Sequence, residues 1–267
     1  MRKTEAILSF SIVLLASCTA FTPTSEDFPL DNKPRIVVAV IDSGIKDSLK
    51  DANFVCKTGN KDFTNTGLND SHGHGTHISG LIDQYAKDIV FGENHSTIKS
   101  LLNKKIDYCQ LILKYWDPIA DDQNLEREIA ALRYAITMKV DIINFSSGGD
   151  FYSVEEHEVI KEALDAGIKI VVAAGNGKSG EKGHDISVSE KHYYPACDDT
   201  RLTIVGNTDE HGNVAFTSNF GSVVNAWEIG TQRLSLSTPK LAIYMTGTSQ
   251  ATAVRTGKIV HEMLSHP

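Results

Sequence analysis

Four polar residues of the sequence have the types that acyl-transfer chemistry requires: Asp42, His74, Asn176 and Ser249. A serine hydroxyl is a weak nucleophile at neutral pH and needs a base to take its proton. A histidine suits that role because its ordinary pKa lies near physiological pH, and a buried carboxylate can hold its ring in the required tautomer. The tetrahedral intermediate carries an oxyanion, which an asparagine amide and a backbone N–H at a helix start can stabilise.

Each of these residues, taken alone, also fits a purely structural role. Asp42 could cap a turn after a strand, and Ser249 could be the N-cap of a helix. Asn176 lies between two glycines and could adopt the left-handed conformation of a turn. The chemical interpretation therefore depends on whether the surrounding elements bring the four residues to one place.

Three closely spaced histidines, His72, His74 and His77, raise the alternative of a metal site. Zinc sites need a third or fourth ligand at a firm spacing, and no cysteine or acidic residue follows such a spacing here. No Cys-x-x-Cys pair is present either. We therefore expect no metal site.

The elements that would position these residues alternate between strand and helix patterns. Continuous apolar runs predict buried strands at 36–41, 111–113, 142–145, 168–174 and 203–205. Apolar residues at helical spacing predict helices over 75–85, 125–136 and 153–167, and from 249 to about 264. This alternation predicts one α/β domain: a three-layer, doubly wound, mostly parallel sheet with helices on both faces.

Two of the predicted helices carry recognisable caps. Asp121 or Asp122 is placed to cap the helix over 125–136. Ser153-x-x-Glu156 has the pattern of a capping box, and Gly167 is placed to end that helix.

Three polar residues follow predicted strands: Asp42, Ser146 and, one residue further on, Asn176. Ligand sites in such sheets lie at the carboxyl ends of the strands. We therefore expect these residues to share one site.

Three segments, in this order, resemble the Asp, His and Ser blocks of the subtilase family of serine proteases. They are Val40–Gly44, His72–Gly80 and Gly247–Ala253, with smaller matches at Asn144–Gly148, Ala173–Asn176 and Tyr194–Ala196. The resemblance extends from about Ile36 to the end of the chain. It implies a subtilisin-like fold and a serine endopeptidase that cuts polypeptides.

The resemblance also implies a role for each matched residue. Asp42, His74 and Ser249 match the catalytic triad, and Asn176 matches the oxyanion donor. Among the other histidines, His77 falls inside a helix and is expected to be structural, and His72 is expected to line the cleft.

Two further segments match the substrate-binding strands of the family. Ser146, Ser147 and Gly148 match the strand that pairs with an extended peptide backbone. Ala173, Ala174 and Gly175 match a wall of the first specificity pocket. Their small side chains predict an open pocket, which favours a large apolar residue.

Four features depart from the family. Only a short tether replaces the folding pro-domain, so the domain folds unaided or with a partner in trans. The loop before Leu111 lacks the family's calcium pattern, so we expect no cofactor and leave calcium open. Ala253 stands where proline is usual. Fourth, the chain ends soon after the last helix, and Trp227–Gly230 replaces the usual Ala-Pro-Gly.

Two rival functions remain in view. One is a catalytically latent or inactive peptide-binding protein on the same fold: the missing pro-domain and the missing proline argue slightly for it, and the intact match to the triad argues against it. An esterase would share the acyl-transfer chemistry, but its Gly-x-Ser-x-Gly elbow is absent around Ser249.

The N-terminus has the layout of an export signal. Met1–Lys3 is basic, 7–16 is apolar, and a small residue precedes Cys18, as in the lipobox of bacterial lipoproteins. The alternative is an ordinary signal peptide that contains a cysteine. The expected boundaries are a signal peptide at 1–17, a tether at 18–34 and a peptidase domain at 35–267. This implies an exported bacterial protein anchored to the envelope membrane by a lipid on Cys18, at the outer membrane in a Gram-negative organism.

Charge and cysteine count narrow the remaining classes. The 267-residue chain has a formal net charge of -8, which disfavours a nucleic-acid surface. After Cys18, three cysteines remain: Cys56, Cys109 and Cys197. One disulfide among them is expected to be feasible, its pairing is left open, and at least one thiol stays free.

Overall fold

The computed structural model describes residues 34–89, 96–238 and 240–266. The predicted signal peptide at 1–17, Cys18 and the predicted tether up to Lys33 lie outside these residues, so the interpretation of the N-terminus stays a prediction. Within the described residues, no helix combines the length and apolar character needed to cross a membrane.

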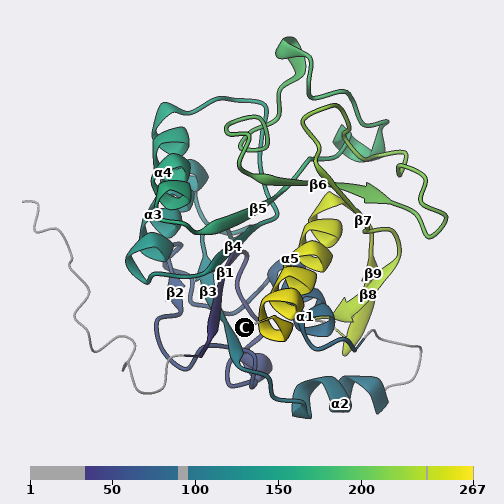
Figure 1. The fold of residues 1–267 in the computed structure, drawn as a ribbon. Coiled ribbons are helices and arrows are strands. Elements are labelled where there is room, and N and C mark those ends of the chain that lie inside the picture. The colour runs from purple at the N-terminus through teal and green to yellow at the C-terminus, as the bar shows by residue number, and fades with distance from the viewer. Residues whose placement is uncertain (1–33, 90–95, 239, 267) are drawn as a thin grey trace, which may run out of the picture.

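A seven-stranded parallel sheet forms the centre of the molecule (Figure 1). Its strands are β1 (Ile36–Asp42), β2 (Lys61–Asp62), β3 (Tyr108–Lys114), β4 (Ile142–Phe145), β5 (Lys169–Ala173), β6 (Thr203–Thr208) and β7 (Ala226–Ile229). The spatial order is β2-β3-β1-β4-β5-β6-β7, so the chain turns in opposite directions on either side of β1. Such a switch point opens a crevice beyond the carboxyl ends of the strands. A separate antiparallel pair consists of β8 (Arg233–Leu236) and β9 (Ala242–Met245).

Helices cover both faces of the parallel sheet (Figure 1). One face packs against α1 (His74–Ala86) and α5 (Thr248–Ser265), and the other against α3 (Asn124–Thr137) and α4 (Val154–Asp165). A further helix, α2, spans Ser96–Asn103. Alternate side chains of β1 enter the two cores: Val37 and Ile41 face α3 and α4, and Val38 and Val40 face α1 and α5. This arrangement confirms the predicted α/β fold with helices on both faces of a parallel sheet.

One of the two predicted helix starts is wrong. Helix α3 begins after Gln123, which makes no side-chain capping bond. Asp121 instead accepts the N–H of Gln123 and pairs with Arg127, which anchors the turn before the helix. At α4 the expected Ser153 cap is present, because its hydroxyl oxygen accepts the N–H of Glu156.

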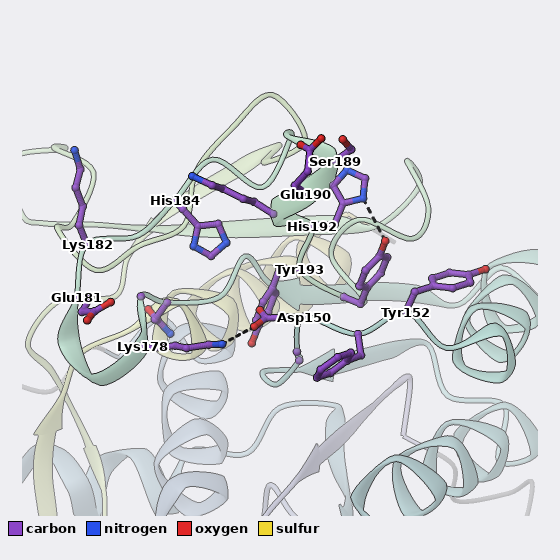
Figure 2. A pocket seen from close by; sticks show the side chains of 17 residues that line it. Asp150, Tyr152, Lys178, Glu181, Lys182, His184, Ser189, Glu190, His192 and Tyr193 are labelled. Atoms are coloured by element: carbon purple, nitrogen blue, oxygen red, sulfur yellow. Dashed lines mark hydrogen bonds and ion pairs between the residues drawn. The ribbon is translucent and has the colours of Figure 1, made fainter.

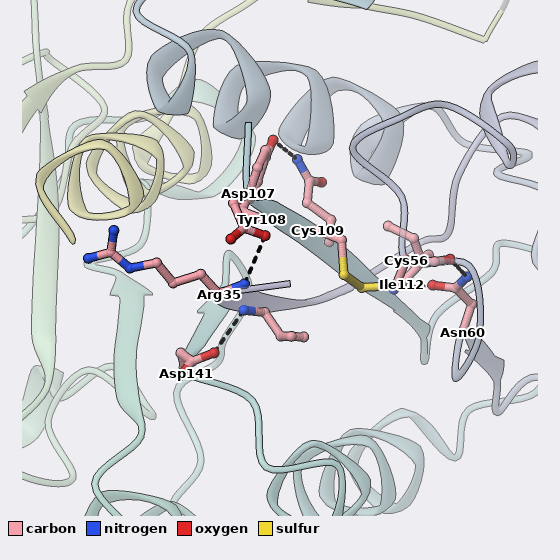
Figure 3. Close-up of a disulfide and its surroundings, with 10 residues drawn as sticks. Arg35, Cys56, Asn60, Asp107, Tyr108, Cys109, Ile112 and Asp141 are labelled. Atoms are coloured by element: carbon pink, nitrogen blue, oxygen red, sulfur yellow. Dashed lines mark hydrogen bonds between the residues drawn. A yellow bond between two sulfur atoms is a disulfide. The ribbon is translucent and has the colours of Figure 1, made fainter. Parts of the chain in front are cut away.

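Cys56 and Cys109 form a disulfide (Figure 3). Cys197 is a free thiol. Cys109 lies in β3. Cys56 lies in an extended segment beside it, where the Cys56 N–H donates to the carbonyl of Gln110 at 2.9 Å. The bond joins residues 53 positions apart and holds the edge of the sheet to the chain that precedes β2.

Removing this disulfide should lower the free energy of unfolding by about 4 kcal/mol, because closing a loop of this length restricts the unfolded chain by roughly that amount. The double variant Cys56→Ser with Cys109→Ser tests this in urea denaturation. Cys197→Ser is the matched control and should unfold near the wild-type midpoint. Equal urea midpoints for wild type, the double variant and Cys197→Ser would contradict the Cys56–Cys109 disulfide.

Three carboxyl groups are buried together between α3, α4 and the segment before β6. Glu128 is 8% exposed and Glu156 is 4% exposed. Burial raises the pKa of Glu128, and a hydrogen bond with Glu156 raises it further. Burial and the charge of Glu156 raise the pKa of Asp198 to about 7. Neither oxygen of Asp198 has a hydrogen-bond partner among the described residues, and the Nδ1 atom of His157 lies 3.8 Å from one of them.

This cluster predicts that the fold loses stability as pH rises. The pKa of Asp198 is about 7 in the folded chain against an ordinary 3.8, so between these values the folded state binds more protons. Stability should therefore fall from about pH 4 to pH 7 and stay low above it. Asp198→Asn should unfold at higher urea than wild type at pH 8 and should lose less stability between pH 5 and pH 8.

Asp199→Asn is the control for this measurement, because Asp199 pairs with Arg201 and has a lowered pKa. A decline with pH of the same size in Asp198→Asn and wild type would exclude Asp198 as its source.

Candidate active site

Asp42 and His74 meet at the carboxyl end of β1. Asp42 is the last residue of that strand, and His74 is the first residue of α1. The Nδ1 atom of His74 lies 2.9 Å from Oδ1 and 3.0 Å from Oδ2 of the Asp42 carboxylate. A neutral ring therefore donates its Nδ1–H to the carboxylate and leaves Nε2 unprotonated. In this tautomer, Nε2 can accept a proton.

The start of α1 is held by a buried carboxylate that the sequence analysis did not single out. Asp70 accepts the N–H of Gly73 at 2.7 Å, the N–H of Thr76 at 2.8 Å and the hydroxyl of Thr76 at 2.6 Å. It also accepts the hydroxyl of Ser43 at 2.9 Å. These bonds satisfy the free N–H groups of the first helical turn and fix the orientation of His74. An Asp shortly before a predicted helix could have indicated this role.

Burial and pairing have opposite effects on the two charges. Burial lowers the pKa of His74, but the charge of Asp42 and the hydrogen bond with it outweigh burial, so the pKa lies above 6.5. Burial raises the pKa of Asp42, and the same pairing brings it below 3.8. The pair therefore stabilises the fold fully between about pH 4 and pH 6.5. The stabilisation falls at higher pH as His74 loses its proton and at lower pH as Asp42 gains one.

Ser249 lies in the first turn of α5, opposite the end of β4. Its hydroxyl donates to the carbonyl oxygen of Ser146 at 2.9 Å, and the hydroxyl of Ser146 donates to the carbonyl of Ser249 at 3.3 Å. The hydrogen bonds of the described residues include none between Ser249 and His74. The structure thus brings Ser249 to Ser146 but does not pair it with the histidine.

Asn176 stands beside the same helix start. Its side-chain oxygen accepts the N–H of Thr248 at 3.1 Å. Because that bond engages the amide oxygen, the amide nitrogen Nδ2 is the atom left to donate to another group. The N–H of Ser249 belongs to the first helical turn, where N–H groups lack an acceptor within the helix. Two donors therefore lie near one helix end, where the helix dipole favours negative charge.

A cavity of about 250 Å³ opens above Asp42 and His74. Its lining residues are Asp42, Ser43, His72, His74, Tyr115, Trp116, Ser146 and Ser147. His72 packs edge-on against Trp116, with ring centroids 4.7 Å apart, so it lines the cleft as expected. The backbone groups of Ser147 and Gly148 are not used in the hydrogen bonds of the described chain, so this edge can receive an extended peptide.

A larger cavity of about 780 Å³ has Gly148 in its lining, the residue after Ser147 of the first cavity. Figure 2 shows the side chains around this larger cavity. Asn176, Gly177 and Tyr193 also line it, together with charged side chains of the segment 178–192. Ala173 and Ala174 line neither cavity, because both residues are buried in the interior of the protein.

The sequence of the chain also matches a family of known proteins. The sequence profile of the subtilase family, Peptidase S8, matches residues 33–263. The chain belongs to the subtilase family. Asp42, His74, Asn176 and Ser249 all fall within the matched range.

Characterised subtilases resemble the chain at moderate identity. The major intracellular serine protease of Bacillus subtilis (strain 168) is 30% identical over 222 residues, which cover 81% of this chain and 64% of that protein. Subtilisin amylosacchariticus of Bacillus subtilis subsp. amylosacchariticus is 29% identical over 236 residues, covering 87% and 56%. The chain thus spans less than two thirds of these relatives. The crystal structure of a cold adapted subtilisin-like serine proteinase shares the fold, with a TM-score of 0.64 and 19% identity over 88% of this chain and 77% of that one.

Two other residues of the subtilase motifs, His77 and Ala253, lie inside helices of the fold. His77 is buried, and burial lowers its pKa to about 4, so its ring is neutral and packs at the carbonyls of Arg233 and Ile243. It thereby joins α1 to β8 and β9. Helix α5 continues through Ala253, where the family usually has proline. Among the described residues, no group of three or more His, Cys, Asp or Glu side chains is arranged to hold a metal ion.

The Asp42–His74 pair predicts a specific change in the titration of the histidine. In wild type, the His74 ring should titrate above pH 6.5 when its carbon-bound protons are followed by NMR. In Asp42→Asn the pairing is lost while burial remains, so the pKa should fall below 6.5. His72→Gln assigns the neighbouring signal and should leave the His74 titration nearly unchanged. A His74 pKa that does not respond to Asp42→Asn would refute the pairing.

Proposed function

We propose that this subtilase is a serine endopeptidase that hydrolyses peptide bonds through an acyl-enzyme intermediate. The observation that carries the proposal is the Asp42–His74 hydrogen bond at the cleft, beside a helix start that bears Ser249 and holds Asn176. A carboxylate, an imidazole, a hydroxyl and two amide donors are the groups that acyl transfer needs.

The reaction begins when the Ser249 hydroxyl leaves the carbonyl of Ser146 and attacks the carbonyl carbon of a bound peptide. His74 Nε2 takes the hydroxyl proton, and Asp42 stabilises the imidazolium that results. The oxyanion receives hydrogen bonds from Asn176 Nδ2 and the Ser249 N–H. His74 then gives its proton to the leaving amine as the C–N bond breaks, and water hydrolyses the ester by the same steps.

A polypeptide is the substrate that suits this cleft. The unused backbone groups of Ser147 and Gly148 can pair with an extended peptide, and such pairing accepts many sequences because it uses main-chain atoms. The names of the relatives, which include proteases and subtilisins, support the same substrate class.

A second candidate function is peptide binding without catalysis on the same fold. One observation favours it: the Ser249 hydroxyl is bonded to the carbonyl of Ser146 rather than to His74. A hydroxyl that stayed there could not pass its proton to the base. Hydrogen bonds of active sites without substrate are often incomplete, so the endopeptidase is the function we adopt.

We also propose that the chain is exported and held at a bacterial envelope through a lipid on Cys18. The basic and apolar order of the first residues and the small residue before Cys18 support this proposal. The Cys56–Cys109 disulfide independently supports the export, because disulfides persist mainly in oxidising compartments outside the cytosol.

The full chain should react with a fluorophosphonate probe at Ser249, because such probes label a serine that a base activates. Ser249→Ala and His74→Ala should both abolish labelling. Asn176→Ala should retain labelling at a reduced rate and should lose roughly a hundred- to a thousand-fold in peptide turnover, the loss that removal of one oxyanion donor causes in subtilisin.

Lys161→Ala, on the exposed face of α4, is the matched control for these variants. A variant of His77 would not serve, because that residue is buried in the fold. Lys161→Ala should label like wild type. A folded wild-type chain that fails to label would contradict the endopeptidase and favour the peptide-binding function. An unchanged turnover in Asn176→Ala would remove that residue from the mechanism.

A further inference from the structure

Two chain segments enclose a crevice beside Ser249. Residues 146–149 follow β4 and residues 175–177 lie just after β5, and these two strands are parallel neighbours. The first segment bonds to Ser249 through the carbonyl of Ser146, and the second bonds to Thr248 through Asn176. A peptide whose reacting carbonyl lies between Ser249 and Asn176 therefore directs the side chain of that residue into the crevice.

The ring of Tyr193 lies in this crevice, in contact with both walls. A Cβ atom built on Gly148 would lie 2.7 Å from Cε1 and 3.0 Å from Cζ of Tyr193. A Cβ atom built on Gly175 would lie 2.8 Å from each of the same two carbons. Carbon atoms without a bond between them do not approach so closely, so the ring touches both glycines and fills the space between them. Glycine is required on either side because the ring occupies the space of a side chain.

The backbone around Tyr193 is held in place. The N–H of Tyr194 donates to the carbonyl of Gly149 at 2.8 Å, and the N–H of Gly149 donates back to the carbonyl of Tyr194 at 2.9 Å. The N–H of Cys197 donates to the carbonyl of Tyr193 at 2.9 Å. Burial, together with the negative charge of nearby acidic groups, raises the pKa of Tyr193 to about 12, so its phenol stays neutral. The ring is thus a fixed, uncharged part of the crevice.

An ion pair crosses the outer side of the same crevice. Lys178 Nζ lies 2.7 Å from the carboxylate of Asp150, and the two residues follow the two walls, one on each side (Figure 2). Both are substantially exposed, so the pair contributes little stability. The cavity beyond it is lined by further charged and polar side chains, among them Glu181, Lys182 and His184. A large apolar side chain would meet the Tyr193 ring first and charged groups next.

We infer that Tyr193 determines the specificity of the proposed endopeptidase, because its ring fills the crevice and limits the residue on the acyl side of the cleaved bond to glycine, alanine or serine. This inference rests on the proposed function. It is the opposite of the open pocket expected from the sequence. That expectation rested only on the small size of the residues matched to the pocket wall. The amino-acid side chain that fills the space comes from a third segment.

The test uses two peptidyl diphenyl phosphonates of one sequence that end in the phosphonate analogue of alanine or of phenylalanine. These compounds bond to the serine oxygen with loss of phenol, so their labelling rates report the crevice without turnover. Each rate is divided by the rate of a simple fluorophosphonate with the same protein, which corrects for changes in serine reactivity. The full chain is compared with Tyr193→Gly and with Tyr193→Phe, which keeps the ring and removes only the hydroxyl.

Wild type and Tyr193→Phe should react with the alanine compound about a hundred-fold faster than with the phenylalanine compound, because an aromatic side chain that cannot be buried loses roughly that factor. Tyr193→Gly should gain about a hundred-fold with the phenylalanine compound. Wild type that reacts with both compounds equally, or prefers phenylalanine, overturns the inference even if Tyr193→Gly fails to fold. If the simple probe also fails to label folded wild type, the proposed function fails and the inference with it.

Discussion

The close contact between α1 and α5 is the constraint on which the site depends. His74 begins the first helix and Ser249 lies in the first turn of the second, so the contact of the helices sets how base and nucleophile face each other. Gly257 makes this contact possible, since a Cβ atom there would fall 2.6 Å from the carbonyl oxygen of Ile82. At the other end, a Cβ atom on Gly75 would fall 2.4 Å from the carbonyl of Gly44, next to Asp42. Catalytic geometry tolerates errors of only a fraction of an ångström. Glycines at these two positions let the backbones come into direct contact, and this contact fixes the positions of the helices more closely than packing through side chains would.

A second support consists of charges buried near the start of α1. Lys114 at the end of β3 is fully buried, and its ammonium donates to the carbonyls of Gly67 and Asn69 and to the carboxylate of Asp117. These bonds hold the segment that leads to Asp70, which in turn holds the first turn of α1. Losing one partner of such a buried pair leaves the other charge uncompensated, which typically costs about 3–5 kcal/mol. The orientation of His74 thus rests on a chain of polar contacts that starts on a neighbouring strand.

Local patterns in the sequence determined much of the fold. Buried parallel strands are continuous apolar runs, so β1 and β4 were predicted almost to the residue, and the helical spacing of apolar side chains located α1, α3, α4 and α5. Because parallel strands end at one edge, the placement of Asp42 and Ser146 directly after strands was enough to assign them to one site. The short edge strand β7 and the β8–β9 pair were not predicted, because edge strands bury little surface and carry weak patterns.

The sequence by itself therefore determined the order of elements and the residue types of the site, since both depend on periodicity and on neighbours along the chain. Only the tertiary structure decided which cysteines pair, that the Ser249 hydroxyl meets Ser146, and that the ring of Tyr193 enters the crevice between Gly148 and Gly175. Each of these contacts joins segments far apart in the sequence. Their geometry follows from how whole elements pack against one another, and no local pattern of residues records that packing.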